Sequence, residues 1–220
     1  MSQTVISHAY PATPDSTFYP AVARSLEAAG IDVATPAMPQ SKPGPAGWLP
    51  ALKSAISASP AETALAGHSI GAWNIFRYLE GRGTDEEPFA GVVVVAAPAH
   101  YIHFPDLLDF FAEPIDWSRV QAGARTFTVI CAPDDRILAP DSLAHGRALR
   151  DALGAKLLVL PTGGHFAPFD NCVDLPELTN DILRLLHPTW LPTPPRAGTE
   201  PPPWLTNYDQ LRDSPKRAAP

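Results

Sequence analysis

The stretch Gly67–Gly71, Gly-His-Ser-Ile-Gly, places a hydroxyl nucleophile between two glycines at a fixed spacing. A short apolar run, Thr63–Ala66, precedes it, and a helical pattern follows it as far as Glu80. This strand–turn–helix context is typical of the G-x-S-x-G nucleophile elbow, in which the serine sits on a sharp turn with its hydroxyl exposed. The pattern predicts that Ser69 is a nucleophile; the alternative is a chance match in a loop rich in Gly and Ser.

A weak serine nucleophile needs a base and an orienting acid, and both residue types follow in the expected order. Two adjacent carboxylates, Asp134 and Asp135, come directly after the apolar run Thr126–Cys131. His165 follows two glycines after the next apolar run, Lys156–Leu160. The order serine, acid, histidine is that of an α/β-hydrolase triad.

Only one of the two adjacent carboxylates should point at His165. Asp135 is favoured because an aliphatic residue, Ile137, and then Pro140 follow it in a pattern that suits the triad acid. Asp134 would then cap the turn, a common task for aspartate in loops. We expect Asp135 as the acid and keep Asp134 as the alternative.

Four further histidines compete for a chemical role. His68 lies inside the elbow, and His100 and His103 follow the fourth expected strand, which is out of order for the base. Together with His8, the last two could suggest a metal site, but no acidic partner or H-E-x-x-H spacing accompanies them. We therefore expect no metal and no other cofactor.

The developing negative charge of an acyl transfer needs backbone donors and a pocket around it. The expected donors are the N–H groups of Ile70, after the nucleophile, and Tyr10, in the loop after the first strand. Ala97–Val120 is long enough to cover the site, and its modest length favours a small acyl or alcohol group over a long lipid. The expected pocket wall consists of aromatic residues, several of which could equally belong to the core, namely Tyr10, Trp73, Tyr101, Phe104 and Phe166.

The elements that must position these residues alternate along the chain. The continuous apolar run Gly91–Ala96 is typical of a strand that is buried on both faces. Strands that alternate with helices predict right-handed βαβ units and one parallel sheet of about six strands, an α/β fold with a minimal lid. The expected strands are Thr4–Ser7, Ile31–Thr35, Thr63–Ala66, Gly91–Ala96, Thr126–Cys131 and Lys156–Leu160, and the expected helices are Ser16–Ala29, Gly47–Ala58, the segment after Ser69, Ser142–Leu153 and Leu175–Leu186.

Composition narrows the class of protein further. The chain has 220 residues, 45% of them hydrophobic and 18% charged, as in an ordinary globular domain. A net charge of −7 without a basic stripe argues against a nucleic-acid partner. No apolar run reaches membrane-spanning length and no signal peptide is visible, so we expect no membrane partner and a cytoplasmic location. Two cysteines do not indicate a disulfide framework.

The C-terminal part of the chain differs in character from the rest. We expect a hydrolase domain over residues 1–187 and a proline-rich tail over 188–220, because clustered prolines exclude regular helices and central strands. A solvated tail is one interpretation. Trp190, Leu191 and Trp204 are unusual in a free tail, and they could dock on the domain or on a second subunit to give a homodimer.

The residues singled out above resemble a known family, the small lidless α/β-hydrolases grouped with retinoblastoma-binding protein nine and bacterial YdeN. The resemblance covers roughly the first 186 residues and implies a sheet without the first antiparallel strands of larger hydrolases. It also implies a triad of Ser69, Asp135 and His165. Family members usually have His-Gly after the first strand, where this chain has His8-Ala9. The likeness rests on GHSIGA at Gly67–Ala72, Trp48, DLLDFFAEPIDW at Asp106–Trp117, APDDRIL at Ala132–Leu138 and GGHF at Gly163–Phe166.

Three functions are compatible with these features. The first is a carboxylesterase-like serine hydrolase that acts on a small acyl substrate through an acyl-enzyme. The second is a hydrolase-fold interaction protein with an idle triad, whose proline-rich tail offers docking segments. The third keeps the triad for thioester hydrolysis, lactone opening or cyclisation in a biosynthetic pathway.

Overall fold

A computed structural model describes residues 1–187 except Lys42 and Thr84, so the expected tail at 188–220 lies outside the described residues. Six strands form one parallel sheet in the order β2-β1-β3-β4-β5-β6. The prediction of an α/β-hydrolase fold with about six parallel strands is confirmed. The strands are β1 (Gln3–Ser7), β2 (Asp32–Ala34), β3 (Thr63–His68), β4 (Gly91–Val95), β5 (Phe127–Cys131) and β6 (Lys156–Val159).

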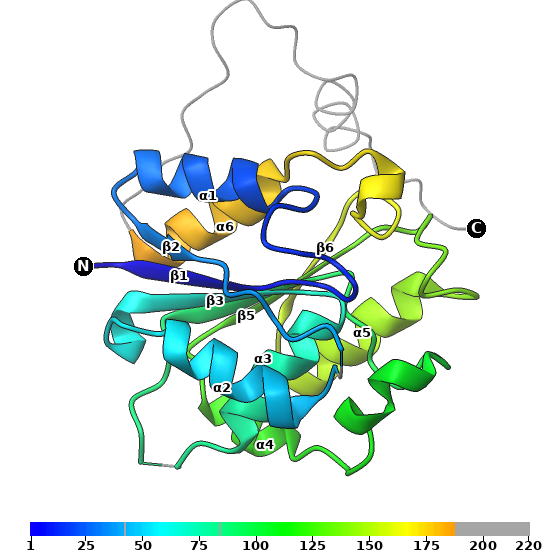
Figure 1. Cartoon of the computed structure of the whole chain (residues 1–220), viewed down its shortest axis with the longest axis horizontal. Helices are drawn as coiled ribbons and strands as arrows, with labels where there is room; N and C mark the ends of the chain where they lie inside the picture. Colours follow the sequence, from blue (N-terminus) through cyan, green and yellow to red (C-terminus); the bar gives the residue numbers. More distant parts are fainter. Residues whose placement is uncertain (42, 84, 188–220) are drawn as a thin grey trace, which may run out of the picture. The chain divides into compact units, whose positions relative to one another are not determined.

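Helices cover both faces of the sheet (Figure 1). One face carries α1 (Tyr19–Ala28) and α6 (Pro176–Leu186), and the other carries α2 (Pro45–Ala55), α3 (Ile70–Glu80), α4 (Trp117–Ala122) and α5 (Ser142–Leu153). Three short 3-10 helices lie in connections: η1 (Pro60–Glu62), η2 (Pro105–Phe110) and η3 (Pro168–Asp170). None of the described helices combines the length and the apolarity needed to cross a bilayer.

Local chemistry sets the ends of the helices. The Asp141 carboxylate caps α5 by accepting the N–H of Ala144 at 2.9 Å, and Gly154 ends that helix in a left-handed conformation with φ 62°. Asp116 caps α4 in the same way, accepting the N–H of Ser118 at 3.0 Å. The segment expected only as a cover of the site thus contains η2 and most of α4.

The sheet separates two hydrophobic layers because side chains alternate along each strand. Val5, Leu65 and Val92 pack with α2 and α3 on one face, whereas Ile6 and Ala66 pack with α1 and α6 on the other. All of these strand residues are at most 1% exposed, so the central strands are buried on both faces.

The candidate site lies at the point where the strand order reverses, between β1 and β3. β2 pairs with one edge of β1 and β3 pairs with the other, with Ser7 opposite Gly67 at the carboxyl ends of the strands. Ligand sites in open α/β sheets form at such a switch point. The fold therefore brings the elbow after β3 beside the loop His8–Tyr10 after β1.

Candidate active site

The elbow is a strained turn between β3 and α3. Ser69 has φ 54° and ψ −123°, a conformation that L residues rarely adopt. A Cβ atom at Gly71 would collide with the carbonyl oxygens of Ser7 and His8, and one at Gly67 would collide with Ala72. The two glycines thus let α3 start against the end of β1, and the turn presents Ser69 at the switch point.

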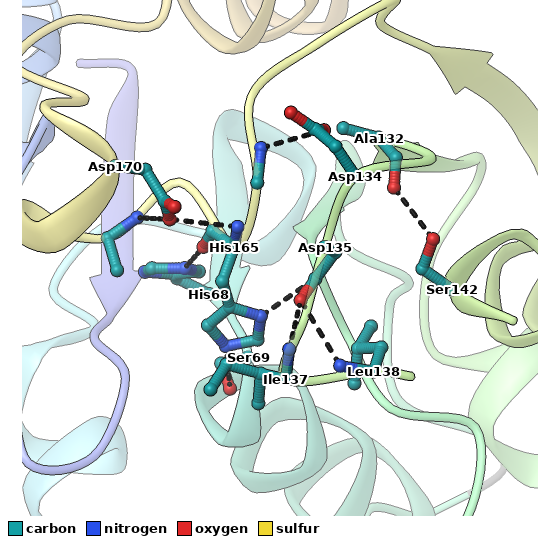
Figure 2. Close-up of polar contacts among 12 residues, drawn as sticks. His68, Ser69, Ala132, Asp134, Asp135, Ile137, Leu138, Ser142, His165 and Asp170 are labelled. Atoms are coloured by element: carbon teal, nitrogen blue, oxygen red, sulfur yellow. Dashed lines mark hydrogen bonds and ion pairs between the residues drawn. The ribbon is translucent and has the colours of Figure 1, made fainter. Parts of the chain in front are cut away.

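Ser69, His165 and Asp135 form one hydrogen-bonded chain of side chains (Figure 2). His165 Nε2 lies 2.9 Å from Ser69 Oγ, and His165 Nδ1 lies 2.8 Å from Asp135 Oδ2. The residues are 6%, 6% and 4% exposed, respectively, so water does not loosen these contacts. With Nδ1–H donated to the carboxylate, Nε2 of the neutral ring is left to accept the serine proton.

The neighbouring backbone holds the Asp135 carboxylate. Its Oδ1 accepts the N–H groups of Ile137 at 2.9 Å and Leu138 at 3.1 Å, which leaves Oδ2 for His165. The acid–aliphatic pattern seen in the sequence thus corresponds to a turn that closes on its own carboxylate.

Asp134 takes a different position from its neighbour. Its carboxylate accepts the N–H of Gly164 at 2.9 Å and of Gly163 at 3.3 Å. Burial opposes the charged form, but these N–H donors outweigh it and lower the pKa of Asp134 below its usual value. The structure therefore brings Asp135 to the histidine ring and Asp134 to the turn before it.

Asp170 is a residue of the site that the sequence reasoning missed. Its Oδ2 accepts the N–H of His165 at 2.9 Å and of Ala167 at 3.1 Å, while φ is positive at Gly164 and Phe166. A Cβ at Gly164 would collide with the Asp170 carboxylate. In the sequence, the signal that could have indicated this turn is the aspartate five positions after the histidine.

The other histidines lie outside the triad. The ring of His68 contacts Tyr19 and the backbone carbonyl of His165, and burial lowers its pKa to about 3. His100 stacks on His145, with ring centroids 4.4 Å apart. Within residues 1–187, leaving aside the two undescribed positions, no three Asp, Glu, His or Cys side chains converge to hold a metal ion.

Of the two expected oxyanion donors, Ile70 directly follows the nucleophile and Tyr10 lines the same cavity as Ser69. Ile70 is the first residue of α3, where N–H groups have no partner inside the helix and the dipole favours negative charge. Tyr10 follows Ala9, whose own N–H is taken by the hydroxyl of Tyr19 at 3.0 Å. Ala9 is not among the described residues with positive φ, so alanine needs no special backbone conformation there.

A cavity of about 490 Å³ opens in front of Ser69 and His165. Among the described residues, its wall contains no Asp, Glu, Lys or Arg side chain. The apolar part of the wall comes from the loop after β1, the segment after β4, the turn after β5 and η3, and includes Pro11, Ala12, Ile102, Phe104, Leu107, Ile137, Pro168 and Phe169.

Of the five aromatic residues expected in the pocket, the structure places Tyr10 and Phe104 at the cavity and the other three elsewhere. Trp73 is 4% exposed and donates its indole N–H to Pro98 O at 2.7 Å in the core around α3. Phe166 is buried between the sheet and α1 and α6, and the ring of Tyr101 lies against that of Phe111 at a tilt, with centroids 5.8 Å apart. Aliphatic residues and prolines line the cavity beside Tyr10, Phe104 and Phe169, whereas the rings of Trp73 and Phe166 fill the layers between helices and sheet.

Comparisons with known proteins show the family and the fold of this chain. The family model described as serine hydrolase matches residues 4–180. The ydeN gene product of Bacillus subtilis superposes with a TM-score of 0.75 at 24% identity, covering 84% of this chain and 98% of that chain. Est1E from Butyrivibrio proteoclasticus superposes with a TM-score of 0.60 at 13% identity, covering 82% of this chain and 85% of that chain. S-formylglutathione hydrolase from Staphylococcus aureus superposes with a TM-score of 0.59 at 16% identity, covering 84% of each chain. A search of curated proteins finds no match.

Proposed function

The chain belongs to the serine hydrolase family, and from this premise we propose that it hydrolyses small, uncharged acyl esters through an acyl-enzyme on Ser69. One observation carries the proposal: the hydrogen-bonded chain from Ser69 through His165 to Asp135 meets an apolar cavity. A nucleophile, a base and an orienting acid within hydrogen-bond reach are the parts that acyl transfer requires.

The proposed reaction begins with attack of Ser69 Oγ on the ester carbonyl. His165 Nε2 takes the hydroxyl proton, and Asp135 holds the ring in the required tautomer and stabilises the imidazolium. The N–H groups of Ile70 and Tyr10 bind the oxyanion of the tetrahedral intermediate. When the intermediate collapses, His165 returns the proton to the departing alcohol. Water then repeats the cycle on the acyl-enzyme, which releases the acid and restores Ser69.

The cavity supports an uncharged, apolar acyl or alcohol group. A charged group would lose its hydration there and find no opposite charge in the described wall. The carboxylate of Asp106, which accepts the hydroxyl of the lining residue Tyr10 at 3.2 Å, would repel an anion. A volume of about 490 Å³ lies within the range of ordinary small-molecule sites.

The apolar wall predicts a dependence on acyl chain length. From acetyl to hexanoyl p-nitrophenyl esters, kcat/KM should rise by up to about fourfold for each added methylene that is buried. Phe104→Ala should flatten this rise and leave the acetyl ester unaffected, since Phe104 lines the cavity and is 46% exposed. Leu108→Ala is the matched control, because Leu108 is in the same segment and similarly exposed at 49% but does not line the cavity. A flat profile in the unaltered protein, or equal effects of both variants, would contradict an acyl site at this wall.

A fluorophosphonate probe tests the proposal directly. The probe should label Ser69, found by mass spectrometry of the modified peptide, and should abolish ester turnover in proportion to labelling. Absence of labelling together with absence of turnover would favour an interaction protein with an idle triad. Labelling without ester turnover would direct the search to thioesters and lactones, which belong in the same screen.

A further inference from the structure

We propose that Tyr19 and His68 are positioning residues that connect the oxyanion loop, His8–Tyr10, to the base loop, Gly163–Asp170. The inference rests on the proposed function of Ser69 and His165. Neither Tyr19 nor His68 takes part in the proton transfers described above.

Three buried hydrogen bonds link the two loops. The N–H of Ala9 lies 3.0 Å from Tyr19 Oη, Tyr19 Oη lies 2.6 Å from His68 Nδ1, and His68 Nε2 lies 2.8 Å from the carbonyl oxygen of His165. The last of these contacts is visible in Figure 2. Tyr19 is 0% and His68 2% exposed, so solvent does not compete for these groups. The connection starts in the loop after β1, passes through α1 and the end of β3, and ends on the base itself.

The chemistry of the end groups fixes the direction of every hydrogen bond. The backbone N–H of Ala9 can only donate, and the carbonyl of His165 can only accept. His68 therefore carries its proton on Nε2, and the bare Nδ1 accepts the hydroxyl proton of Tyr19, whose oxygen accepts from Ala9. A neutral His68 gives the hydroxyl proton of Tyr19 an acceptor, which a charged ring would not, and this agrees with the pKa of about 3 that burial and the nearby His165 and His8 produce.

At one end, this connection holds Ala9, whose N–H lies in the peptide before the one that carries the N–H of Tyr10. Ala9 is fixed at its N–H by Tyr19 and at its carbonyl by the ring of His8, whose Nδ1 lies 2.8 Å from Ala9 O. His8 Nε2 accepts the N–H of Met38 at 2.9 Å, which leaves the His8 proton on Nδ1 as the donor to Ala9. Because the N–H and C=O of a trans peptide point in opposite directions, the N–H of Tyr10 is turned away from the His8 ring.

At the other end, the connection fixes the backbone of the base. The carbonyl of His165 accepts from His68, and its N–H donates to Asp170 at 2.9 Å. The catalytic rate falls when an oxyanion donor or a base is free to rotate, because these groups must then be ordered in the transition state. Tyr19 and His68 should therefore affect kcat more than KM.

Tyr19→Phe removes one oxygen and keeps the ring that packs in the core. We expect kcat for the best ester to fall by about tenfold with KM within about twofold. Thr63→Val is the matched control: Thr63 is 0% exposed, lies at the opposite end of β3, and donates its hydroxyl to Ser59 O at 2.9 Å. This control should lower the melting temperature similarly and leave kcat unchanged. His68→Ala should lower kcat at least as much, and the double variant should lose little more, because both changes interrupt one connection.

A measurement without turnover gives a second test. Nitrogen-15 chemical shifts of the histidine rings should assign the Nε2–H tautomer to His68, and this tautomer should persist down to about pH 5. An Nδ1–H or charged His68 would overturn the proposal even if the enzyme is active. A kcat of Tyr19→Phe equal to that of the unaltered protein would also overturn it. If the unaltered protein shows no Ser69-dependent turnover, the proposed function fails, and the tautomer still decides whether the connection exists.

Discussion

Replacing Ser69 by alanine is expected to lower kcat for ester hydrolysis by about 10⁴- to 10⁶-fold. The hydroxyl is the atom that becomes acylated, and no other described nucleophile lies at hydrogen-bond distance from His165 Nε2. The fold should persist, because alanine occupies less space and the elbow is held by the backbone bond from Ser69 N to Val95 O at 2.8 Å. Initial-rate kinetics, with a thermal melt to check folding, measure both quantities.

Two further variants make this test specific. Ser16 also lines the cavity, so Ser16→Ala should keep kcat within a few-fold if the effect belongs to Ser69 and not to any hydroxyl there. His165→Ala should be nearly as damaging as Ser69→Ala, and the double variant should be little worse, because the residues act as a unit. Turnover by Ser69→Ala well above that of buffer would refute the elbow assignment.

The second large effect is expected at the acid. Asp135→Asn should reduce kcat by about 10³- to 10⁴-fold. The asparagine oxygen can still accept from Ile137 and Leu138, so the amide nitrogen would face His165 and leave Nδ1 as the acceptor. The ring proton would then sit on Nε2, where it blocks removal of the serine proton.

Asp134→Asn is the matched control for this prediction. It stands one position away and carries the same charge, but its partners are the N–H groups of Gly163 and Gly164. An asparagine oxygen can accept from them as well, so kcat should stay within about tenfold. Similar losses from both variants in steady-state kinetics would place the orienting acid elsewhere.

The fold was readable from the sequence because its decisive features are local. Alternating apolar runs and helical segments determine the parallel sheet, and the carboxyl ends of parallel strands bring their loops to one edge. The Gly67–Gly71 turn requires glycines where two backbone segments touch, so the turn can be recognised from the spacing of these glycines in the sequence. The prediction of this fold is confirmed, and the order of Ser69, an acid and His165 already indicated serine chemistry.

Other features depended on contacts between residues far apart in the chain. Asp134 and Asp135 are chemically identical neighbours, and only the position of the base loop, about thirty residues later, decides which carboxylate meets the ring. Aromatic side chains suit a core and a pocket equally well, so Trp73 and Phe166 could be placed in the core only by the packing of helices against the sheet.

By itself, then, the sequence determined the fold class, the elbow and the candidate residues at the strand ends, because strand periodicity and steric limits act over short distances. The tertiary structure alone decided which carboxylate contacts His165, which side chains line the cavity, and that Tyr19 and Asp170 accept hydrogen bonds from the N–H groups of Ala9 and His165. These depend on hydrogen-bond direction and packing between separate elements, and such contacts leave no periodic pattern in a single chain.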